Sequence, residues 1–356
     1  MKTTVIERRT ELLRLYTGLP WKKALLRVET ADPGSLLIPQ PSADQLLLES
    51  RVMAALAWRQ IATVHPWGIK YVDPRPDRLA IEFETDVVGR RDPQETQARD
   101  LAEVLLPRAD EYGEITGVPG ARTHVENGQV LLRLLGTTAS VTLVGLDPAE
   151  WQKAVDDQDH EMSTYGMTPC HRDRPDRWHP AERPFRRPSS RGAAASAWLT
   201  SGLLRRAGLT RSLGVPLAVT GWLNCREREG GERWIIDPTF AEGRGATGHR
   251  RLTALLAAPA WGLPVTVADE YCNCHLPAGY TDQCTTTLGA VRADQPGVLE
   301  VRTIQRRGDR LQRIQQDNPA LYAAQQQLAF PPPAWVDRWL ASWGSTTSGV
   351  PADAVT

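Results

Sequence analysis

The stretch VLLRLLGTTASVTLV, residues 130–144, decides the fold class of this 356-residue chain. Two mainly apolar segments, 130–135 and 140–144, flank its Gly-Thr-Thr sequence, which is typical of two strands joined by a tight turn. Another strand is predicted over residues 79–83, where apolar side chains occupy every second position. We therefore expect an antiparallel or mixed sheet in the N-terminal half.

Helical patterns surround this sheet. Apolar residues recur at helical spacing twice within the first thirty residues, on either side of a Gly-Leu-Pro stop. Ser42 followed by Gln45 predicts a capping box and a helix that reaches residue 56. Asp147 followed by Pro148 predicts a second helix start, because Asp is a good N-cap and Pro suits the first helical position.

The C-terminal half alternates in the same way. Extended segments are predicted at 215–223, 233–237, 265–267, 285–288 and 298–304, and helices at 193–206, 250–258 and 311–328. Residues 215–223 and 233–237 flank a Gly-Gly turn and predict an antiparallel hairpin. The predicted fold class is α+β: a soluble, two-domain protein with mixed or antiparallel sheets flanked by helices.

The predicted organisation has four parts. An N-terminal α+β domain covers 1–159, a basic Pro/Arg-rich linker covers 160–192, a C-terminal α+β domain covers 193–330, and a Trp-striped helix with a disordered tail covers 331–356. An apolar run of about 18 residues is lacking, and so is the apolar core of a signal peptide. We therefore expect a cytoplasmic protein that does not insert into membranes.

Composition excludes several classes of protein. The hydrophobic content of 41% and the charged content of 24% are near globular averages, which argues against disorder throughout, collagen-like repeats and a disulfide miniprotein. The chain has 42 basic and 42 acidic residues, and only five of the basic ones are lysine. Residues 170–251 nevertheless hold 16 basic and 8 acidic residues, so the balanced total hides a basic centre.

Seven arginines within this centre suggest phosphate binding. They lie among prolines without periodicity, which favours an extended, solvated segment, and the neighbouring Trp178 and Phe185 could stack on bases. The predicted nucleic-acid-binding residues are Arg172, Arg174, Arg177, Arg183, Arg186, Arg187 and Arg191. The alternative is a solvated tether without a ligand.

A group of soft ligands suggests zinc. Cys272, Cys274, His275 and Cys284 lie within 13 positions of one another, and zinc prefers four tetrahedral nitrogen or sulfur ligands. Either Cys225 or Cys170 could take the place of His275, because adjacent Cys and His residues need a strained geometry to share one ion. The alternative is that these thiols are small buried side chains.

A glycine-rich loop suggests a nucleotide or S-adenosylmethionine site. Gly243, Gly245 and Gly248 fit the G-x-G-x-x-G pattern before a predicted helix, and Asp269 follows about twenty residues later. Ile-Asp-Pro-Thr-Phe at 236–240 resembles the nucleotide-binding motif of DNA amino-methyltransferases. The predicted hairpin before this loop argues against a parallel βαβ unit.

The same region is similar in order to the transglutaminase-like fold. The similarity covers residues 203–222 and the Trp-Ile-Ile-Asp-Pro-Thr strand at 234–239. It implies a Cys nucleophile, a His base and an Asp orienter. Only Asp237 matches, because residues 193–197 hold alanines and Ser196, and histidine is missing near Asn224. The resemblance thus implies an inactive scaffold.

Three functional hypotheses follow. The preferred one is a binding protein that engages DNA or RNA through the arginine-rich centre and holds a structural zinc. The second is an S-adenosylmethionine- or nucleotide-dependent enzyme that uses the loop at 243–248. The third is an assembly subunit that docks a protein partner through Trp335, Trp339 and Trp343, which share one helical face.

Overall fold

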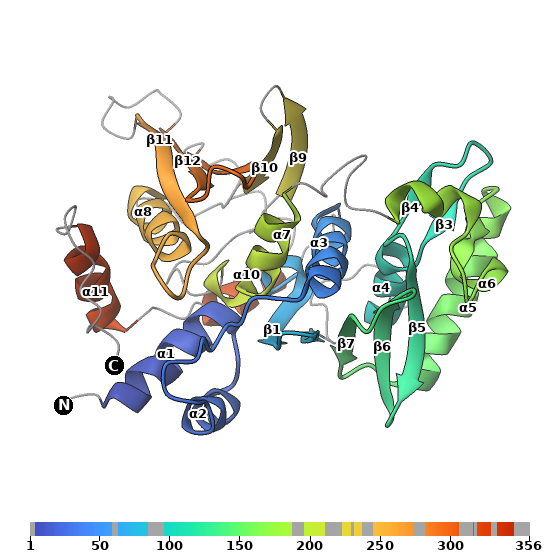
Figure 1. Cartoon of the computed structure of the whole chain (residues 1–356), viewed down its shortest axis with the longest axis horizontal. Coiled ribbons are helices and arrows are strands. Elements are labelled where there is room, and N and C mark those ends of the chain that lie inside the picture. The colour runs from blue at the N-terminus through green and yellow to red at the C-terminus, as the bar shows by residue number, and fades with distance from the viewer. Residues whose placement is uncertain are drawn as a thin grey trace.

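The computed structural model describes residues 4–58, 63–84, 96–186, 196–210, 223–228, 231–236, 245–273, 282–305, 316, 319–328 and 333–344. The predicted α+β class is confirmed, since helices flank sheets with mixed or antiparallel pairing (Figure 1). Within these described ranges, the helices are too short or too polar to cross a membrane.

The first sheet has the strand order β1-β2-β7-β6-β5. Its strands are β1 (Ile69–Pro74), β2 (Arg78–Phe83), β5 (Ala121–Glu126), β6 (Gln129–Leu134) and β7 (Ser140–Val144). Neighbouring strands are antiparallel except β2 and β7, which are parallel. The hairpin predicted around the Gly-Thr-Thr turn is confirmed as β6 and β7.

Helices α1 (Val5–Thr17), α2 (Trp21–Glu29), α3 (Ala43–Trp58), α4 (Gln97–Leu105) and α5 (Pro148–Thr164) belong to this half, with a short 3-10 helix, η1 (Pro66–Gly68). Side chains fix where they begin. Thr4 and Glu7 form a capping box before α1, and Asp147 accepts two backbone N–H groups at the start of α5 as predicted. A small sheet, β4-β3-β8, joins β3 (Arg108–Ala109), β4 (Ile115–Thr116) and β8 (Thr168–Pro169).

The predicted capping box of α3 is wrong. The buried amide of Gln45 does not return to Ser42 but forms two hydrogen bonds with the backbone of Ser140 at the start of β7, at 2.9 and 3.0 Å. The reason is burial: at this helix–sheet contact the backbone groups of Ser140 need partners, and an amide supplies both a donor and an acceptor.

The second sheet has the order β11-β12-β13-β10-β9. Its strands are β9 (Leu223–Arg228), β10 (Gly231–Ile236), β11 (Val265–Cys272), β12 (Asp282–Ala290) and β13 (Val298–Gln305). An antiparallel hairpin of β9 and β10 is present, with the second strand where it was predicted, but the first strand is Leu223–Arg228 and shares only Leu223 with the predicted segment 215–223, of which residues 215–222 lie outside the described part. Two short helices lie with the first half: α6 (Cys170–Asp173), which packs on β3 and β8, and η2 (Pro180–Phe185), whose Glu182 is bound to Arg122 of β5. The remaining helices are α7 (Ala197–Leu204), η3 (Ala207–Thr210), α8 (Gly245–Leu256), α10 (Pro319–Leu328) and α11 (Ala334–Gly344).

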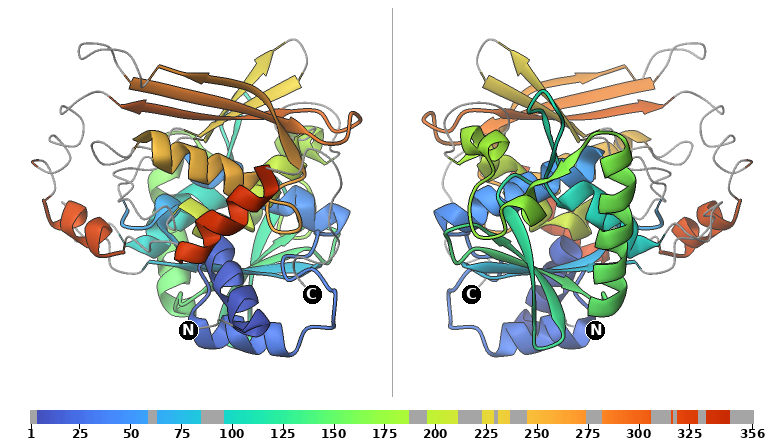
Figure 2. Two further views of the ribbon diagram at one scale, coloured as in Figure 1. Left: turned by 90° about the vertical axis from the view of Figure 1, so that its left-hand side faces the viewer. Right: turned by 90° about the vertical axis from the view of Figure 1, so that its right-hand side faces the viewer.

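Both halves contribute to one connected hydrophobic core. Helices α3 and α7 pack together at its centre, and a buried ion pair fixes them: Arg205 donates from Nε and Nη2 to the Glu49 carboxylate, each at 2.7 Å. Figure 2 shows the second sheet as an outer layer, with α8 against one face and α11 beside α8. The predicted domain boundaries stay a prediction.

Candidate functional site

The arginine-rich centre is more ordered than predicted. We expected an extended tether over 160–192, but α5 continues to Thr164, β8 joins the small sheet, and α6 and η2 follow before residue 187. The sequence of this region lacks apolar periodicity, so its short helices and its strand were not predicted. The cause of this order is polar. A buried ion pair attaches residues 170–186, called here the arginine segment, to the first sheet, and Arg51 of α3 contacts the segment by a hydrogen bond and a cation–π interaction.

A buried carboxylate fixes the arginine segment to the first sheet. Glu182 is fully buried and accepts from Nη2 of Arg122 at 2.8 Å and from Nη1 at 3.0 Å. It also accepts the backbone N–H of Gly120 at 2.7 Å and of His179 at 2.8 Å. Burial alone would raise the pKa of Glu182, but these hydrogen bonds outweigh it and lower the pKa below the ordinary value. The carboxylate thus stays ionised and holds η2 in place.

Trp178 is the second point of attachment. Its ring lies so close to Gly120 that a Cβ there would be 2.2 Å from the ring, and the backbone of Gly120 has φ of +80°, which favours glycine. Arg51, on α3, lies over the ring at 5.8 Å from its centroid and donates to the carbonyl groups of Pro119, at 2.8 Å, and Phe185. Burial lowers the pKa of Arg51 to about 10, so this guanidinium is charged at neutral pH.

These attachments place three of the predicted arginines around one cavity. Arg177, Arg183 and Arg186 line a hollow of about 480 Å³ together with Trp178. The other lining residues are Asp44 and Leu47 of α3, residues 134–137 of the β6–β7 turn, and Asp176. All three arginines are exposed, and within the described ranges their guanidinium groups form no ion pair. We call this hollow the arginine pocket.

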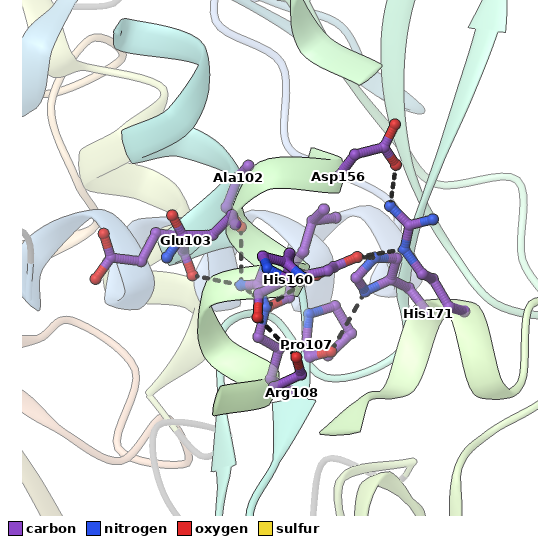
Figure 3. A network of polar contacts seen from close by, with 12 residues as sticks. Ala102, Glu103, Pro107, Arg108, Asp156, His160 and His171 are labelled. Carbon is purple, nitrogen blue, oxygen red and sulfur yellow. Dashed lines mark hydrogen bonds and ion pairs between the residues drawn. The ribbon is translucent and has the colours of Figure 1, made fainter. Parts of the chain in front are cut away.

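Arg172 serves a different purpose. It is bound to Asp156 and to Asp159, and Asp159 also accepts from Arg108, at 2.8 and 3.1 Å, and contacts Nε2 of His171 at 3.0 Å (Figure 3). Arg108 in turn donates to the carbonyl groups at the end of α4. Burial would raise the pKa of Asp159, but the hydrogen bonds from His171 and Arg172 dominate and lower it to about 2. This network joins α4, α5 and α6.

Arg174 is not among the described residues that line the arginine pocket. Arg174 forms an ion pair with the adjacent Asp173 at 3.1 Å. Arg187 and Arg191 lie outside the described residues. Of the seven predicted residues, three meet at one cavity and two are held by carboxylates.

Two of the four predicted zinc ligands come together. Cys272 and Cys284 face each other on β11 and β12 with their Sγ atoms 3.3 Å apart. Cys274 and His275 lie outside the described residues. In the part of the chain that the structure describes, groups of three or more metal-ligating side chains are absent. Zinc at this position stays a prediction.

The glycine loop is partly described. Gly245 is the first residue of α8 and Gly248 lies in its first turn, whereas Gly243 is outside the described residues. Asp269 has an exposed side chain on β11, an edge strand separated from β10 by β12 and β13. The strands on either side of α8 are therefore not neighbours, unlike those of a single βαβ unit. The cofactor hypothesis stays a prediction.

The position that the transglutaminase resemblance assigns to a nucleophile is closed. Ser196 is fully buried, donates to the Glu232 carboxylate and accepts from Nε1 of Trp234 at 2.5 Å. His249, on α8, is also buried, with ring nitrogens 2.8 Å from the Thr286 hydroxyl and 2.9 Å from the Thr303 hydroxyl. Burial lowers the pKa of His249 to about 4, so its ring is neutral at neutral pH. Both groups stabilise the contact between helix and sheet.

The tryptophan helix packs against its own chain. Trp335 donates to Glu11 of α1 at 2.5 Å, and Arg251 of α8 forms an ion pair with Asp337 at 2.9 Å. Trp339 also packs against the core, while the side chain of Trp343 lies outside the description. The predicted assembly role stays a prediction, with two of its three tryptophans already in contact with the chain.

One signal for the attachment of the arginine segment is visible in the sequence. Glu182 is the only glutamate between residues 162 and 226, in the middle of a basic, proline-rich stretch. An isolated carboxylate among arginines is a candidate for a buried ion pair, but its partner Arg122 is 60 positions away. No sequence pattern around Gly120 or Arg51 indicated that these residues contact the arginine segment.

No protein-family model matches the chain, and neither curated proteins nor solved structures give a significant match.

Proposed function

We propose that this protein binds single-stranded nucleic acid and that the arginine pocket holds one nucleotide of the strand. The observation that carries the proposal is the convergence of Arg177, Arg183 and Arg186 with Trp178 on one cavity. Arginine suits phosphate because its planar guanidinium donates two parallel hydrogen bonds. Within the described residues these three groups are not neutralised by a carboxylate, so they are available to phosphate oxygens.

The size of the cavity favours a single strand. A hollow of about 480 Å³ is in the range of small-ligand sites and admits one nucleotide rather than a duplex. Trp178 is one of the lining residues, and stacking of a base on an aromatic ring contributes about 1–3 kcal/mol.

The fixed backbone supports binding as well. Because Glu182 and Arg51 hold the arginine segment in place, the backbone that carries the three arginines is ordered before the ligand arrives. Less conformational entropy is then lost on binding. Asp44 and Asp176 also line the hollow, and their carboxylates would repel a polyanion. The three lining arginines outnumber these two carboxylates.

Anisotropy of fluorescein-labelled single-stranded DNA and RNA tests the proposal. With the full chain, affinity should fall between about 50 and 200 mM salt, and each of the variants Arg177→Ala, Arg183→Ala and Arg186→Ala should lower the slope of log K against log salt by about 0.7. Arg338→Ala is the matched control, because Arg338 is an exposed arginine on α11 away from the hollow. Binding that is absent at low salt would refute the proposal. So would equal affinity of the control and of a variant that combines the three arginine-to-alanine substitutions.

A further inference from the structure

Cys272 and Cys284 occupy a position in the second sheet where a disulfide fits. They are direct partners in the antiparallel register of β11 and β12. The next pair is the hydrogen-bonded one, because Asn273 donates its backbone N–H to the carbonyl of Gln283 at 3.0 Å. Hydrogen-bonded and non-hydrogen-bonded pairs alternate along a ladder, so the two cysteines form a non-hydrogen-bonded pair, where Cα atoms are about 4.5 Å apart.

This geometry requires little movement of the backbone. Disulfides usually join Cα atoms roughly 4.4–6.8 Å apart, and the Sγ atoms already lie 3.3 Å from each other. Rotation of the side chains therefore brings the sulfur atoms to bonding distance.

The two thiols differ in access. Cys272 is half-buried on an edge strand, next to the exposed Tyr271, whereas Cys284 is only 3% exposed. A small reagent can reach Cys272 first, and Cys284 can then reach the sulfur of Cys272. Cys170 is the opposite case, since burial raises the pKa of its thiol to about 12 and makes it unreactive at neutral pH.

We propose that Cys272 and Cys284 form a reversible disulfide by exchange with a low-molecular-weight disulfide such as oxidised glutathione. The Cys272 thiolate attacks one glutathione sulfur, which breaks the glutathione disulfide, releases one glutathione thiolate and forms a mixed disulfide. The Cys284 thiolate then attacks the Cys272 sulfur and releases the second glutathione. The two protein thiols lose two electrons and two protons, and one oxidised glutathione becomes two reduced molecules.

The bridge would close a loop between residues 12 positions apart and join the end of edge strand β11 to β12.

Peptide mapping of the full chain tests this inference. The reduced protein is incubated with oxidised glutathione, remaining thiols are alkylated, and the digest is analysed by mass spectrometry. We expect a linked peptide pair that contains Cys272 and Cys284 and disappears with dithiothreitol. Cys272→Ser should abolish it, while Cys170→Ser should leave it unchanged. Oxidation should also raise the urea midpoint of the wild type but not of Cys272→Ser.

Other outcomes would overturn the inference. A bond from Cys272 to Cys274, or a mixed disulfide that does not resolve, would mean that the two facing sulfur atoms do not react with each other. One equivalent of zinc in the purified protein that protects Cys272 and is lost in Cys272→Ser would make the pair part of a metal site instead. Mapping on the wild-type chain gives the answer even where a variant folds poorly.

Discussion

Removal of the Glu182 carboxylate should destabilise the whole chain strongly. Glu182→Ala deletes four hydrogen bonds, two of them from the buried Arg122 guanidinium. Removal of one partner of a buried ion pair costs about 3–5 kcal/mol, because the other charge stays buried. Arg122 keeps acceptors in the carbonyl groups of Ala121, at 2.8 Å, and Arg174, at 2.9 Å, so we expect the lower end, about 3 kcal/mol.

The assay is urea unfolding followed by tryptophan fluorescence and circular dichroism. Asp294→Ala is the control, since Asp294 and Arg292 form an exposed ion pair in which each side chain is about two-thirds exposed, and solvent-screened pairs of this kind contribute little to stability. Replacement of both buried partners, Glu182→Leu with Arg122→Met, should recover part of the loss, because no isolated charge remains. A loss for Glu182→Ala no larger than that of the control would refute the reasoning.

Three further predictions concern the same contacts. Gly120→Ala should cost about 1–3 kcal/mol of unfolding free energy and shift the emission of Trp178, because the new Cβ would lie 2.2 Å from the ring at a φ of +80°; unchanged stability and emission would contradict this close approach. The pKa of Asp159 is lowered from 3.8 to about 2, so the stabilising effect of its carboxylate is complete above pH 4 and lost as the pH falls toward 2. In urea titrations over this pH interval, the wild type should therefore lose more stability than Asp159→Asn does. Parallel stability profiles of the two proteins would contradict this prediction. Tyr16→Phe should cost about 1–2 kcal/mol, since the buried Tyr16 hydroxyl donates to the carbonyl of Leu255 at 2.8 Å, and thermal melts that coincide with the wild type would show that water replaces the bond.

Local features of the sequence determined most of the secondary structure. Asp147 and Pro148 placed the start of α5, and apolar segments on either side of a short turn placed β6 and β7, because caps and turns act through residues a few positions apart. The capping box was predicted wrongly at Gln45 because the partner of its side chain is not a neighbouring residue in the sequence. The Gln45 amide fits a capping box locally, yet its partner Ser140 is 95 positions away.

Only the tertiary structure decided which residues form the candidate site. Composition marked seven arginines, but it did not separate Arg183, which lines the arginine pocket, from Arg172, which is held by Asp159. That difference depends on where the folded chain brings carboxylates. Likewise the sequence placed Cys272 and Cys284 in one neighbourhood, whereas the register of β11 and β12 made them facing partners. Ion pairs and strand register join residues that are separated along the chain, so the pattern of neighbouring residues does not reveal these contacts.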